Sequence, residues 1–506
     1  MNPHSLTGFR GGLATTLALA LTTGCPPPPP DAVPPVTTAT PSASVAASEG
    51  PDRSRLPTPA PASDWSLPQV ATWEMPNGMR VWHLEERATP LISLGLVFPN
   101  GSASDPVGKA GLTALTADML DEGAGEKSAL AFGEALQRLA TDYHAQSDLD
   151  GVTLSLDMLA DKLDPSLALL ADAVRRPQLP KEELERRKGL WVAQALSRES
   201  DPNATRDVVM SRVLFGDAYG GAPIYGTKTT LKAIRHADVK AQYQALFKPR
   251  GVTVIVVGAV DTATLKQALD KHFGDWQGAP KLPPPRPVAK APARPTEAIY
   301  MIDFPGSTQS SVALGRISSD AHAETYFPEL VFNWALGGAF SSRLNLNLRE
   351  DKGYTYGARA SFSRWEKAGS YTLAAQVKRE TTRPSVDEML KELQRISGSA
   401  PLTAEEHQQA IDGLMLGFPG RFEGLSSTAG QLAYQARVSR PADWLGAWPT
   451  KLRDVSLEAA RQAAVAQTLP SAFAIVIAGD RGVIDESFAD LGRPIVSCDA
   501  EGSCKK

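Results

Sequence analysis

Cysteine and histidine are scarce in this chain, which has three cysteines and seven histidines among 506 residues. Neither charge dominates, because 52 basic and 56 acidic residues are interspersed and leave a formal net charge of -4. Without a basic stripe, we expect no nucleic-acid partner. The apolar run at 13–21 is too short to span a bilayer. With 42% hydrophobic residues the chain can still bury a large core, and its length favours more than one domain.

The first 25 residues have the order of a lipoprotein signal. Arg10 precedes the apolar run, and the letters TTGC follow it at 22–25. This order predicts cleavage before Cys25 and lipid attachment to its thiol, although Thr22 stands where Leu or Val is usual. An ordinary signal peptide cleaved nearby is the alternative. We therefore expect residues 1–25 to be a signal peptide and the protein to be lipid-anchored on the periplasmic side of a bacterial membrane, the outer one.

Proline marks two segments that cannot build a core. Residues 26–66 are rich in Pro, Ala, Ser and Thr and begin with five prolines, which predicts an extended tether. A second proline-rich stretch at 278–295 predicts a linker between two folded domains, at 67–277 and 296–490. We expect residues 491–506 to be a tail.

The two remaining cysteines, Cys498 and Cys504, lie close together in that tail. In an oxidising periplasm they could close a small disulfide loop. The alternative is two free thiols on a frayed end. A metal site is disfavoured because no histidine or third cysteine is nearby.

Both halves of the folded part follow one pattern. Each ends with a polar helical segment, a β-branched run and a glycine, at 237–258 and at 455–479. Each opens with strand-like alternation, at 90–99 and at 299–317, and continues into helical patterns. An internal duplication explains the repetition, and each half is predicted to be α/β or α+β.

Several short motifs occur together in one order and spacing. They are MPNGMRV at 75–81, NGS at 100–102, DPVGKAGL at 105–112, DP at 201–202, YG at 225–226, FGDW at 273–276 and LGG at 336–338. With them the chain resembles the pitrilysin or insulinase-like metallopeptidases, the inverted zincins, over nearly everything from 65 to 485. The resemblance implies two homologous α/β-roll domains that form half of a clamshell, in which two such units enclose a chamber for unfolded peptides.

Active members of this family carry His-x-x-Glu-His on the helix after the Gly-Leu pair, and a further Glu on a later helix. The two imidazoles and the later Glu bind zinc, and the Glu of the motif is the general base. Here the matching positions are Ala114, Ala117 and Asp118, and the later helix offers Ala193 and Gln194. The resemblance therefore implies no catalytic residue, metal site or cofactor in this chain, because one carboxylate does not hold zinc.

A second family feature lies in the second half, in the letters LREDKGYTYG at 348–357. In the family an Arg and a Tyr seven residues apart bind substrate, and they match Arg349 and Tyr356. Guanidinium and phenol can donate hydrogen bonds to a peptide carbonyl or to its developing oxyanion. The alternative is that Arg349 pairs with Glu350 or Asp351 on a solvated face and that Tyr356 simply starts a strand.

The resemblance thus predicts a non-catalytic subunit of a heterodimeric zinc peptidase that processes or degrades peptides in the cell envelope. Its partner would be a sister chain that carries His-x-x-Glu-His and the zinc, and its substrates would be unfolded peptides. A peptide-binding or scaffold protein with the same fold and no role in proteolysis is the second reading. An active peptidase with an unorthodox metal site is the third.

Overall fold

The computed structural model describes residues 65–281 and 285–505. The predicted signal peptide with Cys25 and nearly all of the predicted tether lie outside the described residues. Among those residues, no helix has the length and apolar character needed to cross a membrane.

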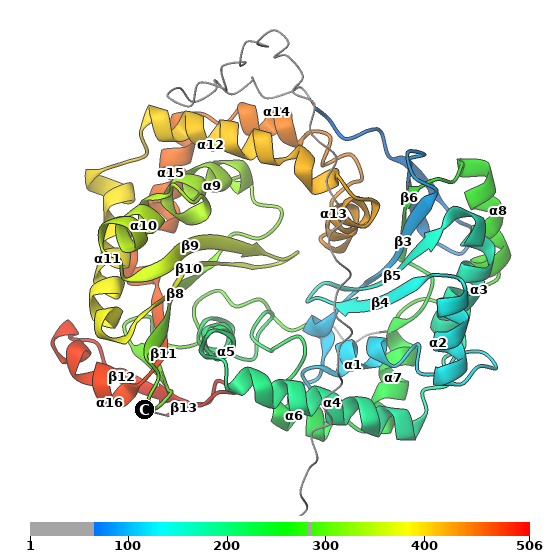
Figure 1. The fold of residues 1–506 in the computed structure, drawn as a ribbon, viewed down its shortest axis with the longest axis horizontal. Coiled ribbons are helices and arrows are strands. Elements are labelled where there is room, and N and C mark those ends of the chain that lie inside the picture. Colours follow the sequence, from blue (N-terminus) through cyan, green and yellow to red (C-terminus); the bar gives the residue numbers. More distant parts are fainter. Residues whose placement is uncertain (1–64, 282–284, 506) are drawn as a thin grey trace, which may run out of the picture. The chain divides into compact units, whose positions relative to one another are not determined.

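The first half contains a sheet of six strands in the order β1-β2-β6-β3-β5-β4 (Figure 1). Only β2 and β6 are parallel. The strands are β1 (Ala71–Glu74), β2 (Arg80–Glu85), β3 (Leu91–Pro99), β4 (Asp142–Ser147), β5 (Gly151–Leu159) and β6 (Thr253–Gly258). The helices are α1 (Leu112–Asp118), α2 (Ala129–Arg138), α3 (Leu163–Arg175), α4 (Lys181–Glu199), α5 (Pro202–Phe215), α6 (Lys228–Ala233), α7 (His236–Leu246) and α8 (Thr262–Phe273).

The second half contains a sheet of seven strands in the order β13-β12-β7-β11-β8-β10-β9. The strands are β7 (Ile299–Asp303), β8 (Gln309–Ser318), β9 (Thr355–Arg364), β10 (Gly369–Lys378), β11 (Ala474–Gly479), β12 (Ile495–Cys498) and β13 (Cys504–Lys505). The helices are α9 (Tyr326–Asn333), α10 (Arg343–Asn345), α11 (Thr382–Gln394), α12 (Ala404–Gly417), α13 (Leu425–Arg437), α14 (Trp448–Arg453), α15 (Leu457–Gln467) and α16 (Arg481–Ile484). Two π-helical turns, η3 (Trp334–Gly338) and η4 (Leu346–Asp351), flank α10.

The two sheets repeat one topology. The order β2-β6-β3-β5-β4 in the first sheet matches β7-β11-β8-β10-β9 in the second, with the same parallel first pair. The β-branched runs that end the two halves are β6 and β11, and every residue of both strands is buried. A strand covered on both faces needs such a continuous apolar run. The predicted α/β class of both halves is confirmed.

The two halves exchange one helix each. Helix α5 of the first half packs on β8 and β11 of the second sheet, and α13 of the second half packs on β3 and β6 of the first sheet (Figure 1). Gly315 of β8 allows the first contact, because a Cβ there would lie 2.5 Å from the Sδ of Met210. Each sheet is therefore covered on one face by a helix from the other half.

Both proline-rich segments contact the folded part. Trp65, at the end of the predicted tether, packs against Phe422 with the ring centroids 5.0 Å apart. Within the predicted linker at 278–295, the Arg286 guanidinium donates hydrogen bonds to the carbonyl oxygen of Asp105. Trp65 thus belongs to the folded part, and the linker is held against the first half.

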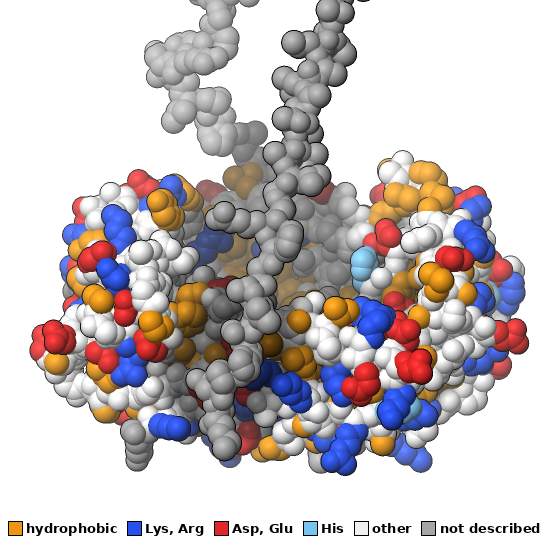
Figure 2. Space-filling view, turned by 60° about the horizontal axis from the view of Figure 1, so that its bottom comes forward, with side chains coloured by type: hydrophobic (Ala, Val, Ile, Leu, Met, Phe, Trp, Pro, Cys, Tyr) orange, Lys and Arg blue, Asp and Glu red, His pale blue; other side chains and the backbone are white. Residues whose placement is uncertain are grey.

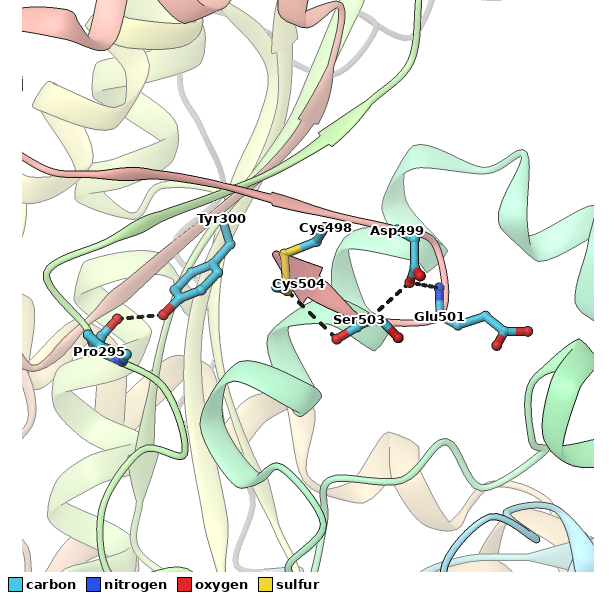
Figure 3. The surroundings of a disulfide bond; sticks show 8 residues. Pro295, Tyr300, Cys498, Asp499, Glu501, Ser503 and Cys504 are labelled. Carbon is cyan, nitrogen blue, oxygen red and sulfur yellow. Dashed lines mark hydrogen bonds between the residues drawn. A yellow bond between two sulfur atoms is a disulfide. The ribbon is translucent and has the colours of Figure 1, made fainter. Parts of the chain in front are cut away.

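The C-terminal residues extend the second sheet, which differs from the tail expected at 491–506. β12 pairs with β7 in parallel, because its two β-branched residues and Cys498 continue the ladder at an open edge. Cys498 lies opposite Cys504 of β13, and the two sulfurs form a disulfide (Figure 3). The Asp499 carboxylate closes the turn between the strands by accepting two backbone N–H bonds.

Candidate functional site

Helix α1 is the segment in which the resemblance places the lost zinc motif. Asp105 fixes its start, because its carboxylate accepts the N–H groups of Gly111 and Thr113 at 2.9 Å. Burial raises the pKa of Asp105 to about 6, although these hydrogen bonds favour the charged form. Ala114 and Ala117 are buried, at 4% and 1% exposure, so methyl groups fill the space where an imidazole and a carboxylate would project.

Asp118, the third motif position, is held by a guanidinium. Arg187 of α4 donates from Nε to Oδ2 at 2.7 Å and forms a second bond to Oδ1. The same guanidinium lies 3.3 Å from Glu122, so it bridges two carboxylates. Gln194 is exposed on α4, two helical turns beyond Arg187.

These residues do not fit zinc. Two positions have no donor atom, and both oxygens of Asp118 are engaged by Arg187. Within the described part of the chain, no group of three or more His, Cys, Asp or Glu side chains could hold a metal ion. An arginine, in place of a metal, neutralises the one carboxylate that is left.

The same place holds further buried polar groups. Burial raises the pKa of Asp121 to about 6, and the charges of Glu122 and Asp118 add to the effect. The hydroxyl of Tyr143 on β4 is buried without a hydrogen-bond partner among the described residues. Burial, with Asp121 and Asp118 nearby, raises the pKa of Tyr143, so its phenol remains neutral.

Tyr356 lies on a β-bulge at the edge of the second sheet. Ala375 of β10 pairs with Ala358, and Val377 pairs with Thr355, so two residues of β9 face one residue of β10. Bulges re-aim side chains and commonly lie next to functional sites. The bulge leaves the Tyr356 ring 89% exposed, on the outermost strand of the sheet.

Arg349 lies on the π-helical turn η4 that precedes this strand. Its guanidinium is 4.5 Å from the ring centroid of Phe340, and its Nε is 3.3 Å from Glu350. An ion pair with Glu350 was the alternative to substrate binding in the sequence analysis. Both side chains of this pair are over a third exposed. Exposed pairs of this kind stabilise little, so Glu350 leaves Arg349 available to a ligand.

Phe340 is 67% exposed and is the part of this site that the sequence did not indicate. Asn345, which is buried, ties it to the strand of Tyr356. Its Nδ2 donates to the carbonyl oxygen of Phe340 at 2.7 Å, and its Oδ1 accepts the N–H of Ala358 at 3.2 Å. An aromatic next to a Gly-Gly pair was the available signal, but a sequence does not show whether such a ring is buried.

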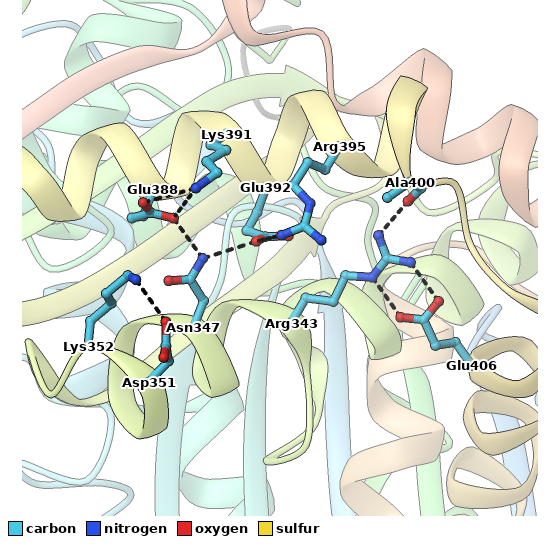
Figure 4. Close-up of polar contacts among 10 residues, drawn as sticks. All are labelled: Arg343, Asn347, Asp351, Lys352, Glu388, Lys391, Glu392, Arg395, Ala400 and Glu406. Atoms are coloured by element: carbon cyan, nitrogen blue, oxygen red, sulfur yellow. Dashed lines mark hydrogen bonds and ion pairs between the residues drawn. The ribbon is translucent and has the colours of Figure 1, made fainter.

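A polar network holds the segment that carries Arg349 (Figure 4). Arg343 forms two hydrogen bonds with Glu406 of α12, each 2.6 Å long. Asn347 donates from Nδ2 to Glu388 and Glu392 of α11. The segment is thus fixed to two helices, and Arg343 has a structural role.

The site has three parts: the Arg349 guanidinium on the Phe340 ring, and the exposed phenol of Tyr356 on β9, the strand against which η4 packs. On the face shown in Figure 2, basic and acidic side chains of the described residues are interspersed, in line with the composition. The chemistry of the site is that of a hydrogen-bond donor pair beside an apolar surface. It can bind and polarise a carbonyl.

Comparisons with known proteins identify the family of the chain. A family model described as insulinase (peptidase family M16) matches residues 80–225, and one described as peptidase M16 inactive domain matches residues 233–414. The chain is 23% identical over 297 residues to an uncharacterized zinc protease, YmxG, of Bacillus subtilis, which covers 59% of this chain and 71% of that protein. It is 24% identical over 347 residues to the non-peptidase homolog YmxG of Helicobacter pylori, which covers 68% of this chain and 78% of the homolog.

Among solved structures, the fold resembles a peptidase M16 inactive domain from Pseudomonas fluorescens. The TM-score is 0.75 at 24% identity, over 81% of this chain and 98% of the other. That likeness concerns the fold, whereas the two family models concern the sequence. The chain belongs to the insulinase family of peptidases, M16, and within it to the non-catalytic type that lacks the zinc motif.

Proposed function

We propose that this chain is the non-catalytic subunit of a heterodimeric zinc peptidase of the cell envelope. In this proposal, Arg349 and Tyr356 bind an unfolded peptide in a chamber shared with a zinc-bearing sister chain. The observation that carries it is Tyr356, whose ring is 89% exposed on a bulge of an edge strand. Packing gives no reason for a large aromatic there, whereas ligand binding does.

The chemistry of Arg349 and Tyr356 as hydrogen-bond donors supports a division of the catalytic roles between the two chains. When a peptide carbonyl is attacked, its oxygen gains negative charge, and hydrogen bonds from a guanidinium and a phenol become stronger. Arg349 is free to form such a bond because its present partner, Glu350, is exposed. The attacking water and its activation would come from the sister chain, since Ala114 and Ala117 cannot supply them.

The location in the cell envelope is part of the same proposal and rests on the sequence before residue 65. An anchor at Cys25 and a proline-rich tether would hold the folded part at a membrane surface while it pairs with a partner. A scaffold that holds peptides or supports a membrane complex is the competing function. It would not need Arg349 or Tyr356.

The test is Tyr356→Phe in the pair formed with a zinc-bearing sister chain. Loss of one hydroxyl that bonds the developing oxyanion should lower kcat/KM by roughly ten- to a thousand-fold, while the pair still assembles. Peptide turnover and size-exclusion chromatography measure the two quantities. Tyr354→Phe is the matched control, because Tyr354 packs against the core of the second half and should leave turnover unchanged.

Unchanged turnover in an assembled pair with Tyr356→Phe would remove the hydroxyl from the mechanism. If Arg349→Ala were silent as well, the scaffold function would replace the proposed one. Arg349→Ala is the less clean variant, since it also uncovers the Phe340 ring and leaves Glu350 without its partner.

A further inference from the structure

A single row of residues crosses the first sheet from its apolar centre to its acidic edge. The strand registers place Leu84 of β2 next to Val257 of β6, then Ser93 of β3, Asp157 of β5 and Asp142 of β4. Residues that are directly paired across strands point to the same face of a sheet. The row therefore changes from aliphatic to acidic along one surface.

This row forms the floor of a groove of about 730 Å³. Helix α13 and the turn before it, with Phe422 and Leu425, form the opposite wall. Most of the remaining lining is apolar and includes Trp65, Leu67, Leu91, Ile92, Met158 and Leu159. A groove of this volume and lining suits a few side chains of a bound peptide.

The charge of the groove has one sign. Its lining includes the carboxylates of Glu86, Asp142, Asp157 and Glu423, and no Lys, Arg or His among the described residues. Glu423 precedes the N-terminus of α13, whose partial positive charge offsets it. Asp142 and Asp157 have no such compensation, and directly opposed like charges destabilise a strand pair.

Asp157 carries a second sign of a missing partner. Its Oδ1 is buried, and no hydrogen-bond donor of the described chain reaches it. A buried acceptor without a donor costs free energy that a bound donor would recover. A compact metal ion would need three or more ligands, and the described residues provide no such group. The groove is therefore suited to an organic cation that donates hydrogen bonds.

We propose that this groove binds a segment of unfolded polypeptide in which a Lys or Arg side chain lies next to an aliphatic or aromatic one. The cation bonds Asp142 and Asp157 at the sheet edge, and the apolar side chain packs against Leu91 and Leu425. This site is separate from Arg349 and Tyr356. It is tested on the full chain alone, so its outcome does not depend on the proposed peptidase partner.

The experiment compares two fluorescein-labelled, acetylated peptides by fluorescence anisotropy. One alternates Leu with Arg, and the other replaces each Arg by citrulline, which has nearly the same shape and no charge. The full chain should bind the Arg peptide at least about tenfold more tightly, because hydrogen bonds between charged groups outweigh neutral ones. In Asp142→Asn/Asp157→Asn this preference should vanish, whereas Glu134→Gln, an exposed control on α2, should keep it.

Thermal unfolding of the same double variant separates binding from folding. Removal of two opposed charges should raise its melting temperature while it weakens peptide binding. A lower melting temperature together with lost binding would overturn the proposal, because the two carboxylates would then serve the fold. Equal binding of the two peptides, or an Arg preference that survives in the double variant, would overturn it as well.

Discussion

At Asp118 the chain keeps a carboxylate where active relatives have a zinc-binding histidine, and Arg187 neutralises it. The replacement removes metal chemistry and leaves three acidic side chains close together, Asp118, Asp121 and Glu122. Arg187 pairs with Asp118 and Glu122. Burial raises the pKa of Asp121 to about 6, and the charges of Glu122 and Asp118 add to the effect. The free energy of unfolding should therefore depend on pH through the ionisation of Asp121.

We expect Asp121→Asn to be more stable than the wild type at about pH 7, by about 2 kcal/mol, and equal to it near pH 4. The folded-state pKa lies above the ordinary value of 3.8, so the stability that this group contributes is complete below about 3.8 and is lost as the pH rises through about 6. Asparagine avoids that loss because it does not ionise. Urea unfolding followed by circular dichroism between these pH values measures the difference.

Asp270→Asn, at an exposed position of α8, is the control and should leave the pH dependence as it is. An Asp121→Asn profile parallel to the wild-type profile would show that burial does not perturb this carboxyl.

The sequence alone indicated which side chains stand at positions 114, 117 and 194, because a family motif fixes which positions to inspect. It could not indicate that Arg187 forms an ion pair with Asp118, since the two residues lie on separate helices, 69 residues apart. It also could not indicate Phe340, because exposure depends on how η3 and β9 pack. The roles of Arg349 and Tyr356 stay predictions, although the bulge and the exposed ring give them a physical basis.

At the scale of elements, η3 lies very close to β9, the strand that carries the bulge. A Cβ on Gly337 of η3 would lie 2.5 Å from the backbone N of Ala360, which is closer than atoms tolerate. The LGG motif at 336–338 therefore places a glycine where the backbone approaches this closely.

Gly337→Ala should lower the free energy of unfolding by about 1 to 3 kcal/mol, the usual cost of forcing a methyl group into packed backbone. Gly430→Ala in α13 is the matched control, because a Cβ there meets nothing within 4 Å and alanine favours a helix. It should stabilise by about 0.5 to 1 kcal/mol. Thermal melts of both variants give the two values, and a Gly337→Ala melt at or above that of the wild type would contradict the packing argument.

At the scale of the whole described chain, the exchange of α5 and α13 makes the halves interdependent. Asp150 of the first half reinforces the contact by accepting the N–H of Glu366, and the Trp365 ring packs 5.7 Å from that of Phe215. Internal duplication could be read from the sequence because each half repeats its own local pattern. The exchange could not, because it places a helix of one half on strands of the other.

Residues 65–281 or 285–505 expressed alone should aggregate, because each half would expose both the apolar face of its sheet and that of its exchanged helix. Co-expression of the two pieces should restore a soluble complex with a single cooperative melt. Gel filtration and calorimetry measure these outcomes. A monomeric half with a cooperative melt of its own would mean that the exchanged helices are not needed for folding.

The helix exchange also delays the covering of the first sheet during synthesis. The last strand of the first sheet, β6, ends at Gly258, but the helix that covers this sheet begins at Leu425, about 170 residues later. At ribosomal rates this interval lasts on the order of ten seconds. During that time the nascent first half has an uncovered apolar sheet, so it has to remain unfolded or be held by a chaperone until the second half emerges.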